Sequence, residues 1–182
     1  MNNQLWWYVA RSGGLVAWAM LGASVLWGLA LSTKVMRGRP RPNWILDLHR
    51  FLGGTALVFT AVHVTSLVLD SYVHFGLVEI LVPFTGSWHP VAVAWGVISL
   101  YLLLAVELTS LARKRISKRT WRMTHYLSFP LFVLTTVHAL TAGTDRSTLP
   151  LRAAVIVVSA VITALTLVRL KKAERHDLLT SP

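Results

Sequence analysis

The residues LHRFLGGTALVFTAVHVTSLVL, at positions 48–69, decide the fold of this chain. They are long and apolar enough for a helix that crosses the roughly 30 Å of hydrocarbon in a bilayer. The stretch carries two histidines, His49 and His63. A second apolar stretch at 123–142, MTHYLSFPLFVLTTVHALTA, repeats the arrangement with His125 and His138. An imidazole in lipid is costly unless it is ligated or hydrogen-bonded, so the four histidines are the first candidates for function.

The composition indicates an integral membrane protein. The chain has 182 residues, of which 54% are hydrophobic and 14% charged, and its mean hydropathy is +0.58. We expect an all-α bundle of five transmembrane helices that forms a single domain over residues 1–182. The expected spans are 12–33, 48–69, 90–111, 123–142 and 150–169.

The basic residues set the expected orientation. Fifteen lie on one side, in the loops between spans one and two and between spans three and four, and in the tail; Arg11, Arg146 and Arg152 alone lie on the other. Short cytoplasmic loops are enriched in Lys and Arg, so the N-terminus is expected outside and the C-terminus inside. The net charge of +11 therefore reflects membrane topology rather than nucleic-acid binding.

The N-terminus, the connection between spans two and three, and the absence of cysteine each add one expectation. Residues 1–5 have no charged region typical of a signal peptide, so we expect no cleaved leader. Segment 75–84, FGLVEILVPF, is apolar but too short to span, and predicts a re-entrant or interfacial piece between spans two and three. Cysteine is absent, which excludes disulfides, iron–sulfur clusters and covalent c-type haem.

The spacing of the histidines predicts two layers. Spans two and four both run from inside to outside, so His49 should lie beside His125, and His63 beside His138. The 14 residues from His49 to His63 correspond to about 21 Å along a helix and leave the two rings about 40° apart around its axis. Gly53 lies on the stripe between them and is a candidate contact for a flat macrocycle; ordinary helix packing is the alternative.

Span four fits this scheme less well. The 13 residues from His125 to His138 leave the rings about 140° apart on an ideal helix. Pro130 lies between them and removes one backbone hydrogen bond. We therefore expect a proline kink that returns both histidines to one face.

Two histidine pairs at two depths are typical of axial ligands to two stacked haems. A bare metal site is disfavoured, because a metal–ligand bond is only about 2 Å long and the two layers are far apart. Two alternatives stay open: a one-haem or flavin-assisted relative that serves as the membrane subunit of a reductase, and a proton or metal transporter that uses the histidines.

The segments LDLHRFLG, AVHVTSL, MTHYLSFP and TTVHAL resemble the ferric reductase-like transmembrane domain family. That family includes the membrane domains of NADPH oxidases and the haem-binding membrane subunit of a bacterial methionine sulfoxide reductase system. The resemblance implies two b-type haems, with His49 and His125 as iron ligands of the inner one and His63 and His138 as ligands of the outer one. Family members commonly have six spans, whereas five are expected here.

Carried over, the resemblance implies transmembrane electron transfer in a plasma membrane, with a bacterial origin expected. Arg50 and Arg122 lie within a helical turn of the inner ligands and are candidate partners of haem propionates. No dinucleotide-binding glycine motif occurs, so we expect an oxidoreductase membrane subunit without its own flavin or NAD(P)H domain. The expected partners are membrane lipid and a separate flavoprotein, quinol or extracytoplasmic redox protein. Ferric iron, oxygen or a redox protein would accept the electrons.

Overall fold

The computed structural model describes residues 3–33, 43–71 and 75–180, and in these residues it is helical, without a strand. The basic residues at 34–41 and His74 lie outside the described residues. In chain order the elements are α1 (Asn3–Thr33), α2 (Asn43–Leu69), α3 (Leu77–Leu81), α4 (Pro90–Leu111), the 3₁₀ turn η1 (Ala112–Lys114), α5 (Lys118–His125), α6 (Ser128–Thr141) and α7 (Leu149–Thr180).

Four helical stretches in the described residues are long and apolar enough to cross a membrane: Gln4–Thr33, Trp44–Leu69, Pro90–Lys114 and Leu149–Lys172. They correspond to four of the expected spans. Large apolar side chains on their outer surfaces are exposed, among them Val58, Leu108 and Ile156. A bundle with such a surface needs lipid around it, so the chain is an integral membrane protein.

The fourth expected span, 123–142, differs from the expectation. The structure divides it into α5 and the 14-residue α6, joined by a turn at Tyr126 and Leu127. The expected kink at Pro130 is instead a break that begins four residues earlier. Pro130 has no N–H to offer the carbonyl of Tyr126, and its ring clashes with that carbonyl in a continuous helix.

Hydrogen bonds that span three residues instead of four take the place of the missing one at the break. The N–H of Phe129 donates to the carbonyl of Tyr126 at 3.2 Å, and the N–H of Leu127 donates to that of Thr124 at 3.0 Å. Both span three residues, as in a 3₁₀ helix. Pro130 then lies in the first turn of α6, where a missing N–H costs little.

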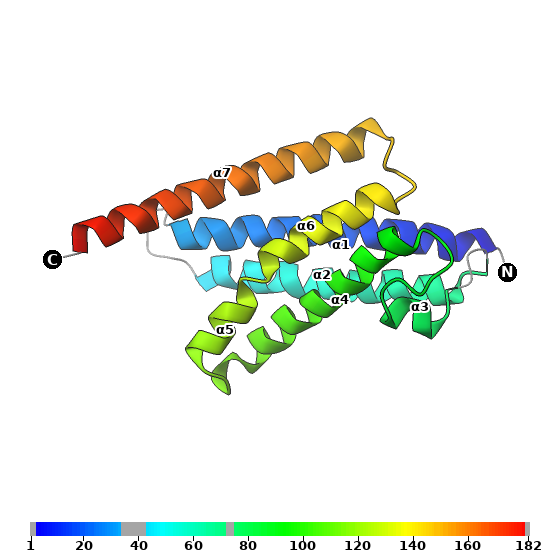
Figure 1. Ribbon diagram of the computed structural model, residues 1–182, viewed down its shortest axis with the longest axis horizontal. Helices are drawn as coiled ribbons and strands as arrows, with labels where there is room; N and C mark the ends of the chain where they lie inside the picture. Colours follow the sequence, from blue (N-terminus) through cyan, green and yellow to red (C-terminus); the bar gives the residue numbers. More distant parts are fainter. Residues whose placement is uncertain (1–2, 34–42, 72–74, 181–182) are drawn as a thin grey trace.

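The helices pack around α1. Helix α2 runs along α1, α6 runs along α4, and α7 covers α1 (Figure 1). One buried cluster joins α1, α6 and α7 through Trp18, Leu29, Phe132 and Ile162. A second joins α1, α2, α4 and α6 through Leu21, Ala56, Leu103 and Leu131. This packing fixes the helices that carry the histidines on either side of a shared interior.

The segment between α2 and α4 forms the short helix α3, at the end of the bundle where α1 begins (Figure 1). Ile80 is buried, whereas Leu77, Val78 and Leu81 are exposed. The hydroxyl of Tyr101 on α4 donates to the carbonyl of Leu81 at 2.5 Å and ties α3 to the bundle. The segment expected to be a re-entrant or interfacial piece thus contains a short apolar helix, and its place relative to the membrane stays a prediction.

Candidate functional site

The four histidines form two pairs. The ring centres of His49 and His125 lie 5.9 Å apart, and those of His63 and His138 lie 6.3 Å apart. We call the first the inner pair and the second the outer pair. Each joins α2 to the α5–α6 segment, which is the arrangement expected of two parallel helices. The pairs lie at two depths, because 14 residues of α2 separate His49 from His63.

The break between α5 and α6 makes both pairs possible. His125 is the last residue of α5, and His138 lies in the last turn of α6. On one ideal helix the two rings would point about 140° apart. The turn at Tyr126 and Leu127 changes the backbone course between them, so that both rings meet partners on α2.

Three of the four imidazoles bond to a backbone carbonyl of a neighbouring helix. The Nδ1 atoms of His49, His63 and His138 lie 3.0 Å, 2.7 Å and 2.8 Å from the carbonyl oxygens of Ser24, Ala10 and Ala92. A carbonyl oxygen only accepts, so each Nδ1 carries the proton and donates. The Nε2 of each ring is then an unprotonated nitrogen with a lone pair, which is the form that binds a metal.

His125 is held differently. Its Nδ1 lies 3.5 Å from the hydroxyl oxygen of Ser110, at the outer limit of a hydrogen bond. Its ring stacks on Trp121, with the ring centres 5.1 Å apart, and Arg113 covers the indole at 4.5 Å from the ring centre. The stack on Trp121 orients the ring of His125, but it does not fix the position of the ring proton as a carbonyl does for the other three.

Glycines make room for three of the rings, and sequence reasoning missed them. A Cβ added at Gly14 would lie 3.0 Å from Nδ1 of His63, one at Gly28 3.2 Å from Cε1 of His49, and one at Gly96 2.7 Å from Cε1 of His138. Gly14 and Gly28 are 14 residues apart, the same spacing as His49 and His63. That shared spacing is the feature of the sequence from which these two glycines could have been predicted as neighbours of the histidines.

Gly53, the glycine that was singled out, lies against a different group. A Cβ there would come within 2.6 Å of Oε1 of Glu107 on α4. Its neighbours on the same stripe, Ala56 and Thr60, do line the interior cavity at the outer pair. Gly53 thus makes room for a carboxyl group beside the bundle interior.

The two arginines named from the sequence lie near the inner pair's end of the bundle. Arg50 is exposed, and its Nη1 lies 3.3 Å from a carboxylate oxygen of Asp47. The Nη2 of Arg122 donates to the hydroxyl of Tyr126 at 3.4 Å, as does the Nη2 of Arg169. Cationic groups therefore surround the junction of α5 and α6.

A cavity of about 250 Å³ opens at the outer pair, between α1, α2, α4 and α6. His63 and His138 line it, and most of its other walls are apolar. Ser99 Oγ and Asp70 Oδ1 also face this region and have no hydrogen-bond partner among the described residues. Buried polar atoms without partners are costly, so these two need a partner such as a water molecule or a bound group.

The pairs suit a metal that brings its other ligands with it. A metal–imidazole bond is about 2 Å long, so one ion between two imidazoles places the ring centres about 6 Å apart. Both observed separations agree with that value. Among the described residues no group of three or more His, Asp or Glu side chains could hold an ion. Two axial nitrogens per site fit a macrocycle that fills the equatorial positions.

The comparisons with known proteins agree with this geometry. The family model for the ferric reductase like transmembrane component matches residues 13–136, which is more than half of the chain. The chain belongs to this family. The match runs from α1 into α6 and includes His49, His63 and His125; it ends two residues before His138. Ferric reductase-like domains generally bind haem, and membership indicates transmembrane electron transfer.

No curated protein and no solved structure matches the chain.

Proposed function

We propose that the chain is a di-haem b-type cytochrome that carries electrons across the membrane. His49 and His125 would hold the inner haem, and His63 and His138 the outer one. The observation that carries the proposal is the geometry of the two pairs, with ring centres 5.9 Å and 6.3 Å apart. Both separations suit one iron between two imidazoles.

The residues of this chain would do three things for the cofactors. Carbonyls of Ala10, Ser24 and Ala92 keep the proton on Nδ1 and so direct Nε2 toward the interior. Gly14, Gly28 and Gly96 allow the rings to lie close to the neighbouring helices. Apolar walls exclude water. Haem bound between two imidazoles supplies one-electron transfer, at a potential that these surroundings tune.

The proposed topology uses five crossings. Helices α1, α2, α4 and α7 cross the membrane, and α5 with α6 together form the remaining crossing. The N-terminus lies outside and the C-terminus inside, because the outer end carries few basic residues. Arg50 and Arg122 lie at the inner end and are proposed partners of the inner haem's propionates.

The proposed setting is a bacterial plasma membrane. A separate flavoprotein or quinol would exchange electrons with one end of the bundle, and a flavin would belong to that partner. The acceptor would be ferric iron, oxygen or an extracytoplasmic redox protein. In this role the chain is the membrane subunit of an oxidoreductase.

Haem stoichiometry tests the proposal directly. Purified protein in detergent should show a Soret band and, after dithionite, the sharp bands of b-type haem, with two haems per chain. His63→Ala and His138→Ala should each remove one haem, and the double variant should remove no more than either. His49→Ala and His125→Ala should do the same for the other haem. His89→Asn is the matched control, because the side chain of His89 is exposed and does not line the cavity, and Asn tolerates the left-handed backbone at this position.

The outcomes separate the candidates. A colourless protein after haem-supplemented expression would contradict haem binding altogether. One haem per chain would favour the one-haem relative, and the weaker hold on His125 makes the inner site the one to be empty. Loss of both haems from a single substitution, with the fold intact, would contradict two separate sites.

A further inference from the structure

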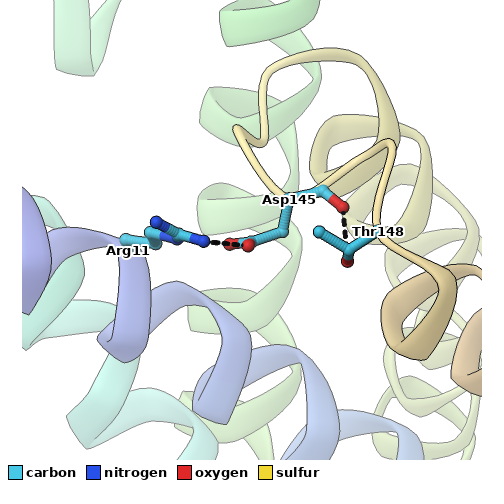
Figure 2. Close-up of polar contacts among 3 residues, drawn as sticks. All are labelled: Arg11, Asp145 and Thr148. Atoms are coloured by element: carbon cyan, nitrogen blue, oxygen red, sulfur yellow. Dashed lines mark hydrogen bonds and ion pairs between the residues drawn. The ribbon is translucent and has the colours of Figure 1, made fainter.

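An ion pair lies on the wall of the cavity. Arg11 on α1 grips Asp145, in the loop between α6 and α7, with two hydrogen bonds (Figure 2). The Nε of Arg11 lies 2.5 Å from Oδ2, and its Nη2 bonds Oδ1. The turn is held in place as well, because the hydroxyl and the N–H of Thr148 both donate to the carbonyl of Asp145 at 2.8 Å.

The pair lies beside the outer histidines. Arg11 and Asp145 both line the cavity that His63 and His138 line. Arg11 directly follows Ala10, whose carbonyl accepts the hydrogen bond from His63. The guanidinium also lies over the ring of Trp7, 5.1 Å from the ring centre. The two hydrogen bonds to Asp145 and the contact with Trp7 thus hold the guanidinium of Arg11 beside the outer pair.

Charges at this place act on whatever the outer pair holds. Coulomb interactions weaken with dielectric constant, and an apolar cavity screens them far less than water does. A nearby cation stabilises the electron-rich, reduced form of a redox centre, and an anion stabilises the oxidised form. Since the two side chains bond each other, their effects oppose and nearly cancel.

The position argues against a purely structural role. The side chain of Arg11 is 37% exposed and that of Asp145 12% exposed. A two-pronged pair with one nearly buried partner contributes to stability, but stability alone would not require it to line the cavity. Their placement on the cavity wall, rather than their strength, is what distinguishes them from Arg152, which is exposed and bonds only the backbone of Arg146.

We propose that Arg11 and Asp145 form a charge-balanced pair beside the outer haem, in which each charge shifts the reduction potential of that haem and the other charge offsets the shift. The inference rests on the proposed function, since it needs a haem between His63 and His138. Arg11 raises the potential, and Asp145 offsets most of that rise. Removal of either partner alone should therefore shift the potential, in opposite directions.

Spectroelectrochemical titration of the haem-loaded protein in lipid nanodiscs tests this. Arg11→Gln should lower the potential of the outer haem, and Asp145→Asn should raise it. We expect each to change the reduction equilibrium about tenfold, which corresponds to about 59 mV for one electron. The double variant should return close to the wild-type value. The inner haem is the internal reference, because Ser24 lies 14 residues, or about 21 Å, further along α1 than Ala10. The His63→Ala variant identifies which potential belongs to the outer haem.

Two further variants keep the test decisive. Arg11→Lys keeps the charge but loses the two-pronged bond, so it should keep the potential near wild type; a structural role would make it behave like Arg11→Gln. Arg152→Gln is the matched control and should change neither potential. If Asp145→Asn fails to fold, Arg11→Gln against Arg11→Lys still decides. Unchanged potentials, or shifts of the same sign in both single variants, would overturn the inference. Absence of the outer haem from the wild-type protein would instead overturn the proposed function.

Discussion

At the scale of single residues, backbone atoms do most of the positioning. The acceptors for His49, His63 and His138 are carbonyls within helices, and a carbonyl oxygen has two lone pairs. Each can keep its place in the helix and still accept from an imidazole. Side-chain substitutions at Ala10 or Ala92 leave such an acceptor in place, whereas added bulk opposite the ring moves the ring itself.

Gly96→Ala should displace His138 and weaken the outer haem. The added Cβ would lie 2.7 Å from the imidazole, and crowding of this kind costs about 1–3 kcal/mol. The measurement is haem per chain, with the outer haem identified from the His63→Ala spectrum. Gly54→Ala is the control, because a Cβ there meets nothing within 4 Å. If Gly96→Ala binds the outer haem as fully as the wild type does, the added Cβ does not displace His138 and the prediction is wrong.

Asp145 predicts a pH effect on stability at the outer end. Its hydrogen bonds with Arg11 hold the pKa of the carboxyl below its ordinary value. A lowered pKa in the folded state means stability that is present above the unfolded value of about 3.9 and lost as pH falls through the folded value. Thermal unfolding in detergent should therefore show a smaller acid-side loss for Asp145→Asn than for wild type. Asp47→Asn, in the exposed pair with Arg50, should keep the wild-type profile; equal profiles for Asp145→Asn and wild type would contradict the prediction.

At the scale of elements, the sequence predicts helices better than it predicts their interruptions. Apolar length places α1, α2, α4 and α7, since each must cover a bilayer with side chains. The 13-residue step and Pro130 predict that the remaining segment is distorted. They do not place the break at Tyr126, because the proline acts on the carbonyl four residues before it.

The partners of the histidine rings were harder to predict for a related reason. Gly14 and Gly28 acquire their role only when α1 lies against α2, and Gly96 only when α4 lies against α6. Which helices pack together is a property of the whole bundle, and hydropathy along one segment does not carry it. Gly53 shows the same limit, because the packing of α4 brings Glu107 against it, whereas Ala56 and Thr60 further along α2 line the cavity at the outer pair.

Pro130→Ala should rejoin α5 and α6 and turn His125 away from His49. An N–H at position 130 could donate to the carbonyl of Tyr126, which would favour a continuous helix. On such a helix the two histidines point about 140° apart, so one of the two haems should be lost. Absorption spectra report the loss, assigned against His49→Ala and His63→Ala. Pro150→Ala is the control, since Pro150 lies in the first turn of α7. Two haems in Pro130→Ala would mean that the turn forms without the proline.

At the scale of the molecule, the two ends of the bundle differ in charge. Near the inner pair, Arg113 covers Trp121, Arg122 and Arg169 bond Tyr126, and Lys172 donates to the carbonyl of Thr33 at 3.0 Å. Near the outer pair, the cation of Arg11 is paired with Asp145. Cations therefore dominate the end of the bundle at the inner pair, which is the end that we propose lies inside.

That asymmetry predicts which end faces the cytoplasm, and the absence of cysteine makes the test clean. Arg115→Cys adds one thiol to the exposed loop before α5, and Ser87→Cys adds one to the exposed segment after α3. In intact cells a membrane-impermeant maleimide should label Ser87→Cys and leave Arg115→Cys unlabelled, and permeabilised cells should label both. Arg115→Cys removes only one of fifteen inner cations, which is too few to reverse the orientation. If Arg115→Cys alone is labelled in intact cells, the topology is the reverse of the one proposed. The haem held by His63 and His138, beside the Arg11–Asp145 ion pair, would then exchange electrons on the cytoplasmic side.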